Sequence, residues 1–382
     1  MMDIYKKNKI MNKFDKLNLK GNPFRITPST NVTEIIWAGF PELKKQIETR
    51  IKYSINIPNS SLVLNWGEYG SGKTHALRYF STQQVLKDIA AENTIPYSID
   101  LRFPKSKEPV KELFTQIVDK LDIVRLRRDV EEKHLNIQDI LMSVTDNTFM
   151  HKVFYAMFDQ THNLFTTDPE GLEFKSFLYG TEDYKKYQAK GIIRKLSTDY
   201  DYIEFISILF SILTYDKRVH SCIILWIDEF EDISLLNNAN ISNVNNFVRT
   251  LIDKCPNNLL MFLNLTLSAM ISVADLGEFL HEAVKSRIID RIEFPIPNTS
   301  ELKTYLKELL NNPAYRITTT DNPYAPFSLE VIDAVIQKLG NASLRKYNET
   351  FSRLIEIAAY EGYDEINNAN FASLINEIII WQ

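Results

Sequence analysis

Glycine and cysteine are scarce in this chain. Its 382 residues include 11 glycines and two cysteines, Cys222 and Cys255. Two cysteines cannot build a disulfide framework, which favours a protein of a reducing compartment. The six histidines are scattered and show no metal-ligand spacing. Because 45% of the residues are hydrophobic and 12% are aromatic, the composition excludes disordered and collagen-like chains.

Long hydrophobic runs and an excess of positive charge are also missing. The longest apolar runs, such as residues 222–227, are far too short to span a membrane. No apolar core follows the N-terminal lysines as it would in a signal peptide. The net charge of −5 gives no overall positive field, so any nucleic-acid binding requires a local patch. We therefore expect a cytoplasmic protein without a membrane partner, long enough for two or three domains.

The chain does contain an alternation of strands and helices up to Pro297. Short apolar runs predict buried strands, and apolar residues at every third or fourth position predict helices between them. The expected strands are 61–66, 94–103, 222–228, 259–267 and 291–296, and the expected helices are 41–55, 73–91, 108–122, 243–255 and 276–288. This order predicts an α/β fold with a parallel sheet that is covered on both faces.

The two ends of the chain differ from this pattern. Residues 1–21 are expected to form a basic N-terminal arm, since the first twenty hold six lysines against two aspartates. After residue 297 only helical periods remain, so we expect a domain boundary there. Residues 22–297 would form the α/β core, and residues 298–382 an all-α bundle.

Three of the eleven glycines lie in one segment, between an expected strand and an expected helix. It reads Gly67-Glu68-Tyr69-Gly70-Ser71-Gly72-Lys73-Thr74 and satisfies the pattern G-x-x-x-x-G-K-[ST]. The backbone N–H groups of such a loop converge on a phosphate, and its glycines permit the required dihedral angles. Lys73 would reach the β- and γ-phosphates, and the Thr74 hydroxyl would ligate Mg²⁺. The sequence therefore predicts ATP and Mg²⁺ as cofactors.

An acidic pair closes the apolar strand at 222–228. Asp228, at the carboxyl end of a central strand, can complete the Mg²⁺ coordination shell beside Thr74. The adjacent Glu229 can polarise a water molecule for attack on the γ-phosphate. Glu231 and Asp232 follow, and we interpret them as surface residues.

The two motifs, GEYGSGKT and then CIILWIDEFED, resemble those of the AAA+ ATPases, in particular the initiator and loader relatives of origin-recognition proteins. The resemblance covers roughly residues 22–360. It implies a P-loop core with ATPase activity, a helical lid over 298–382, and ATP bound between lid and core and between subunits of an oligomer. Origin-recognition relatives end in a winged-helix DNA-binding domain. Because the sequence stops at Gln382, soon after the lid, we expect none here.

The resemblance also implies roles for polar residues outside the two motifs. Asn264 is similar to the sensor-1 residue, which orients the attacking water or contacts the γ-phosphate, and Thr266 is the alternative. Arg345 is similar in place to the sensor-2 arginine of the lid. Asn341 departs from the acidic residue that usually precedes this arginine.

An arginine finger and an adenine pocket are further implications of the resemblance. Arg287 would reach the ATP of a neighbouring subunit and stabilise charge in the transition state, and Arg291 is the alternative. Either arginine could instead be an ordinary residue at a helix end. Pro23, Phe24 and residues 37–39 are candidates for the adenine pocket, with burial under the sheet as the alternative role.

The segment between the two motifs is longer than the fold requires. Helix, strand, helix and strand need about 60 residues, whereas about 155 separate Lys73 from Asp228. We expect the excess to form a helical insertion over about 123–210, aromatic-rich and basic. The basic residues of this segment that are candidates for nucleic-acid contact are Arg125, Arg127, Arg128, Lys185, Lys186, Lys190, Arg194 and Lys195. They could bind a nucleic-acid backbone or simply form solvated helix faces.

Two classes of function remain open on these observations. One is an oligomeric ATPase acting on DNA or on a DNA-bound partner, through the insertion, the arm or a partner protein encoded nearby. Transposition, replication loading and mobile-element or anti-phage defence are its settings. The other is a signalling ATPase that gates an effector protein without binding DNA. A membrane-linked regulatory ATPase is disfavoured by the absence of a spanning segment.

Overall fold

The computed structural model describes residues 12–25, 34–158, 171–181, 184–255, 257–267 and 279–379. The chain divides into two compact units. The sheet unit contains residues 45–66 and 80–293, and the lid unit contains residues 1–44, 67–79 and 294–382. The last segment of the lid unit begins at Phe294, close to the boundary expected near residue 297. This unit also takes in two earlier segments that the sequence assigned elsewhere.

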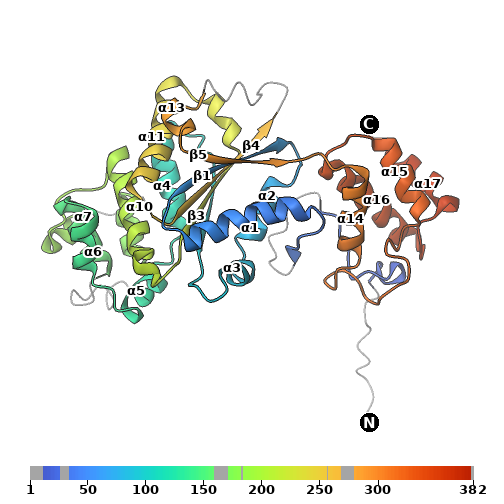
Figure 1. The fold of residues 1–382 in the computed structure, drawn as a ribbon, viewed down its shortest axis with the longest axis horizontal. Helices are drawn as coiled ribbons and strands as arrows, with labels where there is room; N and C mark the ends of the chain where they lie inside the picture. Colours follow the sequence, from blue (N-terminus) through green and yellow to red (C-terminus); the bar gives the residue numbers. More distant parts are fainter. Residues whose placement is uncertain are drawn as a thin grey trace, which may run out of the picture. The chain divides into compact units, whose positions relative to one another are not determined.

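A five-stranded sheet forms the centre of the sheet unit (Figure 1). Its strands are β1 (Ser61–Glu68), β2 (Tyr97–Arg102), β3 (Ile223–Asp228), β4 (Leu259–Leu267) and β5 (Ile288–Phe294), in the spatial order β2-β3-β4-β1-β5. β3 pairs in parallel with both β2 and β4. Because successive side chains of β3 point to opposite faces and its first five residues are all buried, both faces are covered there. The predicted parallel sheet is confirmed.

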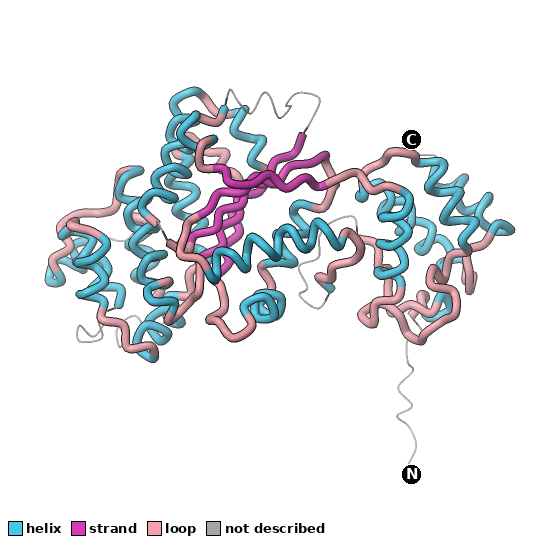
Figure 2. Tube along the Cα trace, in the orientation of Figure 1, coloured by secondary structure: helices cyan, strands magenta, loops and turns pink. Residues whose placement is uncertain are grey.

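Helices pack together beside this sheet, as Figure 2 shows in cyan against magenta strands. α4 (Pro109–Lys120), α10 (Asp199–Leu213) and α11 (Asn238–Lys254) contact one another, and α4 also contacts β2. α1 (Pro41–Asn56) agrees closely with its prediction. Two helix predictions were wrong in extent. Residues 73–91 form α2 (Lys73–Phe80) and α3 (Gln83–Ala90), and the described part of 276–288 is helical mainly in the short α13 (Glu282–Lys285).

The expected insertion is helical. Its elements are α5 (Ile123–Glu132), α6 (Ile137–Val144), α7 (Thr148–Phe158), α9 (Leu172–Leu178) and the 3₁₀ segment η4 (Tyr184–Lys190). α10, which the predicted range included, instead packs on α4 and α11 and belongs to the helices beside the sheet. Nearly every residue of α10 is buried, because α6 contacts it as well.

The lid unit has its own hydrophobic core, built mainly by four helices. These are α14 (Thr299–Leu310), α15 (Leu329–Leu339), α16 (Leu344–Glu361) and α17 (Asn368–Ile379). Leu17 and Leu19 are fully buried in the same core, and the backbone N–H of Lys20 donates to the Tyr315 carbonyl at 2.7 Å. Residues 12–21 of the expected arm thus pack on the lid core and include a short 3₁₀ helix, η1 (Asp15–Leu17), while residues 1–11 lie outside the described part.

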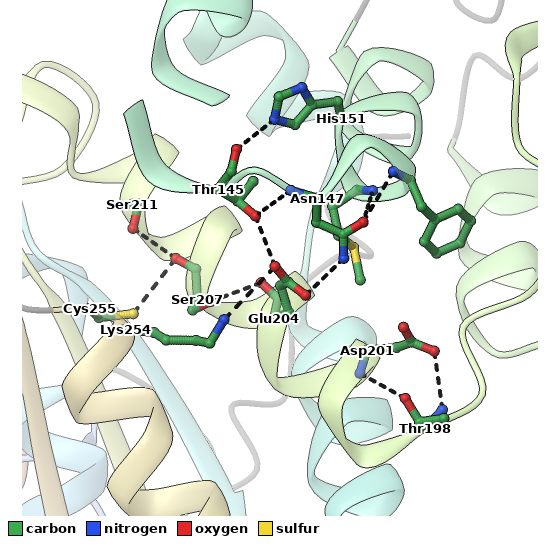
Figure 3. A network of polar contacts seen from close by, with 12 residues as sticks. Thr145, Asn147, His151, Thr198, Asp201, Glu204, Ser207, Ser211, Lys254 and Cys255 are labelled. Carbon is green, nitrogen blue, oxygen red and sulfur yellow. Dashed lines mark hydrogen bonds and ion pairs between the residues drawn. The ribbon is translucent and has the colours of Figure 1, made fainter. Parts of the chain in front are cut away.

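Two buried carboxylates of α10 bind polar groups of other segments, and Figure 3 shows the first of them, Glu204, with Thr145 and Asn147. Glu204 accepts hydrogen bonds from Thr145 Oγ1 at 2.8 Å and Asn147 Nδ2 at 2.9 Å, both from the segment between α6 and α7. Asp201 accepts two from the Arg194 guanidinium, at 2.7 and 2.8 Å. A buried carboxylate is costly unless it is paired in this way. Burial alone would raise the pKa of Asp201, but the bonds from Arg194 and from nearby backbone amides outweigh it and lower the pKa.

Replacing Arg194 by methionine should destabilise the protein in a pH-dependent way. The guanidinium carbon of Arg194 lies 4.0 Å from the centroid of the Phe149 ring, and methionine removes this cation. The buried Asp201 carboxylate then loses its partner, which costs about 1–3 kcal/mol. Since the pKa of Asp201 is lowered by folding, its contribution is present above the unfolded value of about 3.9 and is lost as the pH falls through the folded value. Urea unfolding at several pH values measures this.

The matched control is Arg128→Met, which removes an exposed arginine from the neighbouring helix α5. It should change the free energy of unfolding little at any pH. An Arg194→Met deficit that stays constant down to acidic pH, or that the control reproduces, would contradict the role of the Arg194–Asp201 pair.

Candidate functional site

The glycine-rich segment forms a loop between β1 and α2 and belongs to the lid unit. Gly70 and Gly72 have φ of +79° and +103°, the left-handed region that favours glycine. A Cβ added at Gly72 would meet no atom within 4 Å, so the backbone there faces open space. The loop thus has the backbone conformation and the room that a phosphate-binding turn needs.

Lys73 is the first residue of α2, and its ammonium group is buried within this loop. Nζ donates to the backbone carbonyls of Gly67 and Glu68, both at 2.9 Å, and to Ser71 Oγ at 3.2 Å. The positive charge is therefore held inside the turn by the turn's own oxygens. Thr74 follows it and is half-buried.

Arg345, near the start of α16, lies directly on this loop within the same unit. Its backbone N–H donates to the Gly70 carbonyl at 3.1 Å, and Nη1 donates to the Tyr69 hydroxyl at 2.6 Å. Its Cζ lies 4.9 Å from the centroid of the Tyr69 ring, and Nε is 3.3 Å from Glu349 Oε1. The sequence singled out Arg345 and the loop separately. It contained no signal that Glu349 holds this arginine, apart from the i, i+4 spacing of a helical pair.

The adenine-pocket candidates divide into core residues and one ring beside α2. Phe24 stacks on Phe351 with centroids 5.3 Å apart and is buried in the lid core, and Pro23 is buried as well. Both are buried, as their alternative role required, but Phe24 packs in the lid core and not under the sheet. Trp37 is half-buried and lies 5.4 Å from the Tyr79 ring of α2, with Nε1 donating to the Gly39 carbonyl. Among these candidates Trp37 is the one whose ring lies against the helix that follows the loop.

The acidic and sensor residues come together within the sheet unit. Asp228 ends β3, and Asn264 on the neighbouring β4 donates from Nδ2 to Asp228 Oδ1 at 3.1 Å. Asn65 of β1 in turn donates from Nδ2 to Asn264 Oδ1 at 2.9 Å, and both asparagines are fully buried. The sequence did not single out Asn65, although a polar residue inside a buried strand was a signal. Thr266, the alternative to Asn264, gives its backbone N–H to Glu231 Oε2 at 2.9 Å.

Glu229 directly follows the strand and adopts an unusual backbone conformation. Its φ of 59° and ψ of 37° lie in the left-handed region, which costs a non-glycine residue about 1–2 kcal/mol. Lys105, just after β2, places Nζ 3.6 Å from Glu229 Oε2 and 2.8 Å from Asp232 Oδ2. The hydrogen bond with Asp232, with Glu229 nearby, raises the pKa of Lys105. Glu231 and Asp232 thus have internal partners and are half-buried, not simply surface residues.

The two candidate finger arginines differ in their surroundings. Arg287 forms a bidentate ion pair with Asp253 of α11, both bonds being 2.8 Å, and its Nη1 donates to the Ala283 carbonyl. Arg291 projects from the edge strand β5 and is exposed. The sequence could not reveal the pair, because its two partners lie in different elements.

Several of the basic residues expected on the insertion are used inside the protein. Arg127 is buried and donates from Nε to the Met157 carbonyl at 2.7 Å. Arg194 binds Asp201, and Lys195 Nζ donates to the Gly180 carbonyl at 2.7 Å. The buried Arg127 is therefore wrong as a candidate for a nucleic-acid surface, whereas Arg125, Arg128 and Arg194 are exposed and Lys195 is half-buried. Among the described residues, no helix is long and apolar enough to cross a membrane.

No family model and no curated protein matches the sequence. Solved structures do match it. The ORC2 protein of Aeropyrum pernix, in its ADPNP-ADP complexes, is 13% identical with a TM-score of 0.55, covering 91% of this chain and 72% of that one. The ORC1 protein of Aeropyrum pernix in complex with DNA is 13% identical with a TM-score of 0.50, covering 94% and 70%.

Both similarities cover most of this chain and of the matched chain. Because the sequence identity is 13%, they show a common fold and nothing more. The parallel five-stranded sheet with many helices matches these neighbours. The chain therefore shares the fold of the ORC1 and ORC2 proteins of Aeropyrum pernix.

Proposed function

We propose that the protein binds and hydrolyses ATP with Mg²⁺. The observation that carries this proposal is the loop at 67–74, which combines left-handed glycines, open space at Gly72 and the buried Lys73 ammonium. A fixed cation inside a ring of backbone groups is the arrangement that binds a polyphosphate. The sheet unit supplies a carboxylate and an amide in hydrogen-bond contact, Asp228 and Asn264, which suit the chemistry of a metal-bound phosphate.

Each residue would have a distinct role. When bound, Mg²⁺–ATP supplies the phosphoryl group that is transferred to water. Lys73 Nζ would bind the phosphates, and Thr74 Oγ1 and the Asp228 carboxylate would hold the metal. The Asn264 amide is already oriented by its bond to Asp228 and would orient the attacking water. The Glu229 carboxylate would accept the proton of that water.

The target of this ATPase is a separate proposal. We infer an oligomeric switch or motor acting on DNA or on a DNA-bound partner. One of the similar structures is an ORC1 protein in complex with DNA, and Arg125 and Arg128 remain exposed on the insertion. Turnover stimulated by DNA supports this target. Turnover that responds to a partner protein and not to DNA would instead identify a signalling ATPase.

Replacing Lys73 by alanine should weaken ATP binding. A charge-assisted bond to a phosphate contributes about 1.5–3 kcal/mol, so we expect roughly a tenfold to a hundredfold loss of affinity in calorimetry. Lys87→Ala removes an exposed lysine from the neighbouring α3 and is the matched control. Unchanged ATP affinity in Lys73→Ala would remove the basis of the proposed function.

Replacing Glu229 by glutamine should separate binding from hydrolysis. The variant keeps the size of the side chain but loses the proton acceptor, so turnover should fall by about 10²–10⁴-fold while ATP stays bound. Glu231→Gln is the matched control, since a glutamine oxygen can still accept the N–H of Thr266. If Glu231→Gln were the slower enzyme, the general base would be assigned to the wrong carboxylate.

The oligomer proposal assigns Arg287 as a finger that acts on a neighbouring subunit. Turnover per protomer should then rise with protein concentration, and Arg287→Ala should lower it by about 10³-fold or more while leaving ATP binding intact. Asp253→Ala breaks the same ion pair without removing the arginine, so it should cost stability but not turnover. Arg291→Ala is the second control.

Three outcomes would contradict the finger role of Arg287. These are a rate per protomer that is independent of concentration, equal loss of turnover in Asp253→Ala, and a larger loss in Arg291→Ala. The last of them would assign the finger to the exposed arginine on β5.

A further inference from the structure

The start of helix α16 is capped by the phosphate loop. Ser343, the N-cap residue, makes no side-chain capping bond, whereas the N–H of Arg345 donates to the Gly70 carbonyl at 3.1 Å. A Cβ on Gly70 would lie 2.5 Å from Arg345 Cβ, so only glycine permits this approach. An N–H group in the first turn of a helix needs a partner outside the helix, and here the loop provides it.

The side chain of Tyr69 holds the Arg345 guanidinium on the loop. Nη1 donates to the tyrosine hydroxyl at 2.6 Å, and the guanidinium carbon lies 4.9 Å from the ring centroid. Glu349, one turn further along α16, accepts a hydrogen bond at Oε1 from Arg345 Nε at 3.3 Å. Among the described residues, none accepts a hydrogen bond from Nη2, which leaves two donors for an anion.

Tyr69 is exposed and still makes two contacts with one partner. It is 67% exposed, and its contact with Arg345 uses both the ring and the hydroxyl. A cation over an aromatic face contributes about 0.5–1 kcal/mol at an exposed site, which corresponds to about a twofold to fivefold change in an equilibrium. The hydroxyl adds a charge-assisted hydrogen bond of similar or greater strength.

We propose that Tyr69 is a positioning residue that orients Arg345 for the polyphosphate of the nucleotide. By holding the guanidinium, it also joins α16 to the loop, so that the two respond to a bound phosphate together. This inference rests on the proposed binding of ATP by the loop. Tyr69 itself acts through Arg345 and not through contact with the phosphate.

Hydrogen exchange tests the contact in the full-length protein without nucleotide. Tyr69→Leu should speed the exchange of the Arg345 amide by about twofold to tenfold, because the bond to Gly70 opens more often. Tyr69→Phe keeps the ring and should give a smaller effect. Tyr360→Leu is the matched control: this exposed tyrosine on the same helix also carries a cation, with Lys13 Nζ 4.7 Å from its ring centroid.

Calorimetry with ATP tests the positioning role through a double-mutant cycle. Tyr69→Leu should weaken binding by about threefold to tenfold in the wild-type background and have no further effect in Arg345→Ala. The control Tyr360→Leu should bind ATP as the wild type does. Tyr69→Phe should recover part of the affinity, which a loss of loop stability alone would not explain.

The outcomes separate this inference from the proposed function. Additive losses in the cycle, or an Arg345 amide whose exchange ignores Tyr69, would overturn the positioning role while wild-type ATP binding stands. A wild-type protein that binds no ATP would overturn the proposed function and the nucleotide part of this inference, and the exchange measurement would still decide the Tyr69–Arg345 contact.

Discussion

A row of buried hydrogen bonds between side chains crosses three adjacent strands of the sheet. Asn65 on β1 donates to Asn264 on β4, which donates to Asp228 at the end of β3. In an interior this apolar, a polar side chain without a partner would cost several kcal/mol. A shift of one residue in any of these strands would turn its polar group to the opposite face. The row therefore selects one register, and that register places the carboxylate at the carboxyl end of β3.

Apolar packing around these hydrogen bonds stabilises the same strand register. Trp226 stacks on Phe262 with centroids 4.0 Å apart, one pleat before Asp228 and Asn264 on the same two strands. Burial of large apolar side chains supplies the driving force, and the hydrogen bonds supply the specificity. Burial and hydrogen bonding act together in the same way in the insertion. Aromatic residues fill the space around α10, and Asp201 and Glu204 of that helix select by hydrogen bonds which segments lie against it.

Local sequence patterns were sufficient to predict the elements whose backbone conformation depends on a few neighbouring residues. The apolar run at 222–228 predicted a buried strand, which the structure has, and the glycines at 67–74 predicted a loop between a strand and a helix, which the structure also has. The predicted strands and the helix at 41–55 agree with the structure for the same reason, since periodicity and burial are coupled. The helix at 73–91 was predicted too long, because nothing in its periodicity marks the break at residues 81–82.

Partners that lie far apart in the chain could not be inferred in this way. The pairs Arg345–Tyr69, Arg287–Asp253 and Lys105–Glu229 join elements whose spacing in sequence carries no information about their distance in space. The same is true of Arg127, which is buried and donates to the Met157 carbonyl, and of the exposed Arg194, which binds Asp201. Residue type and periodicity determine the α/β class and the glycine-rich turn at 67–74, because both follow from backbone geometry over a few residues. The partner of each charged side chain depends on which distant segments pack together. The tertiary structure decides this, because segments far apart in sequence meet only when the two hydrophobic cores form.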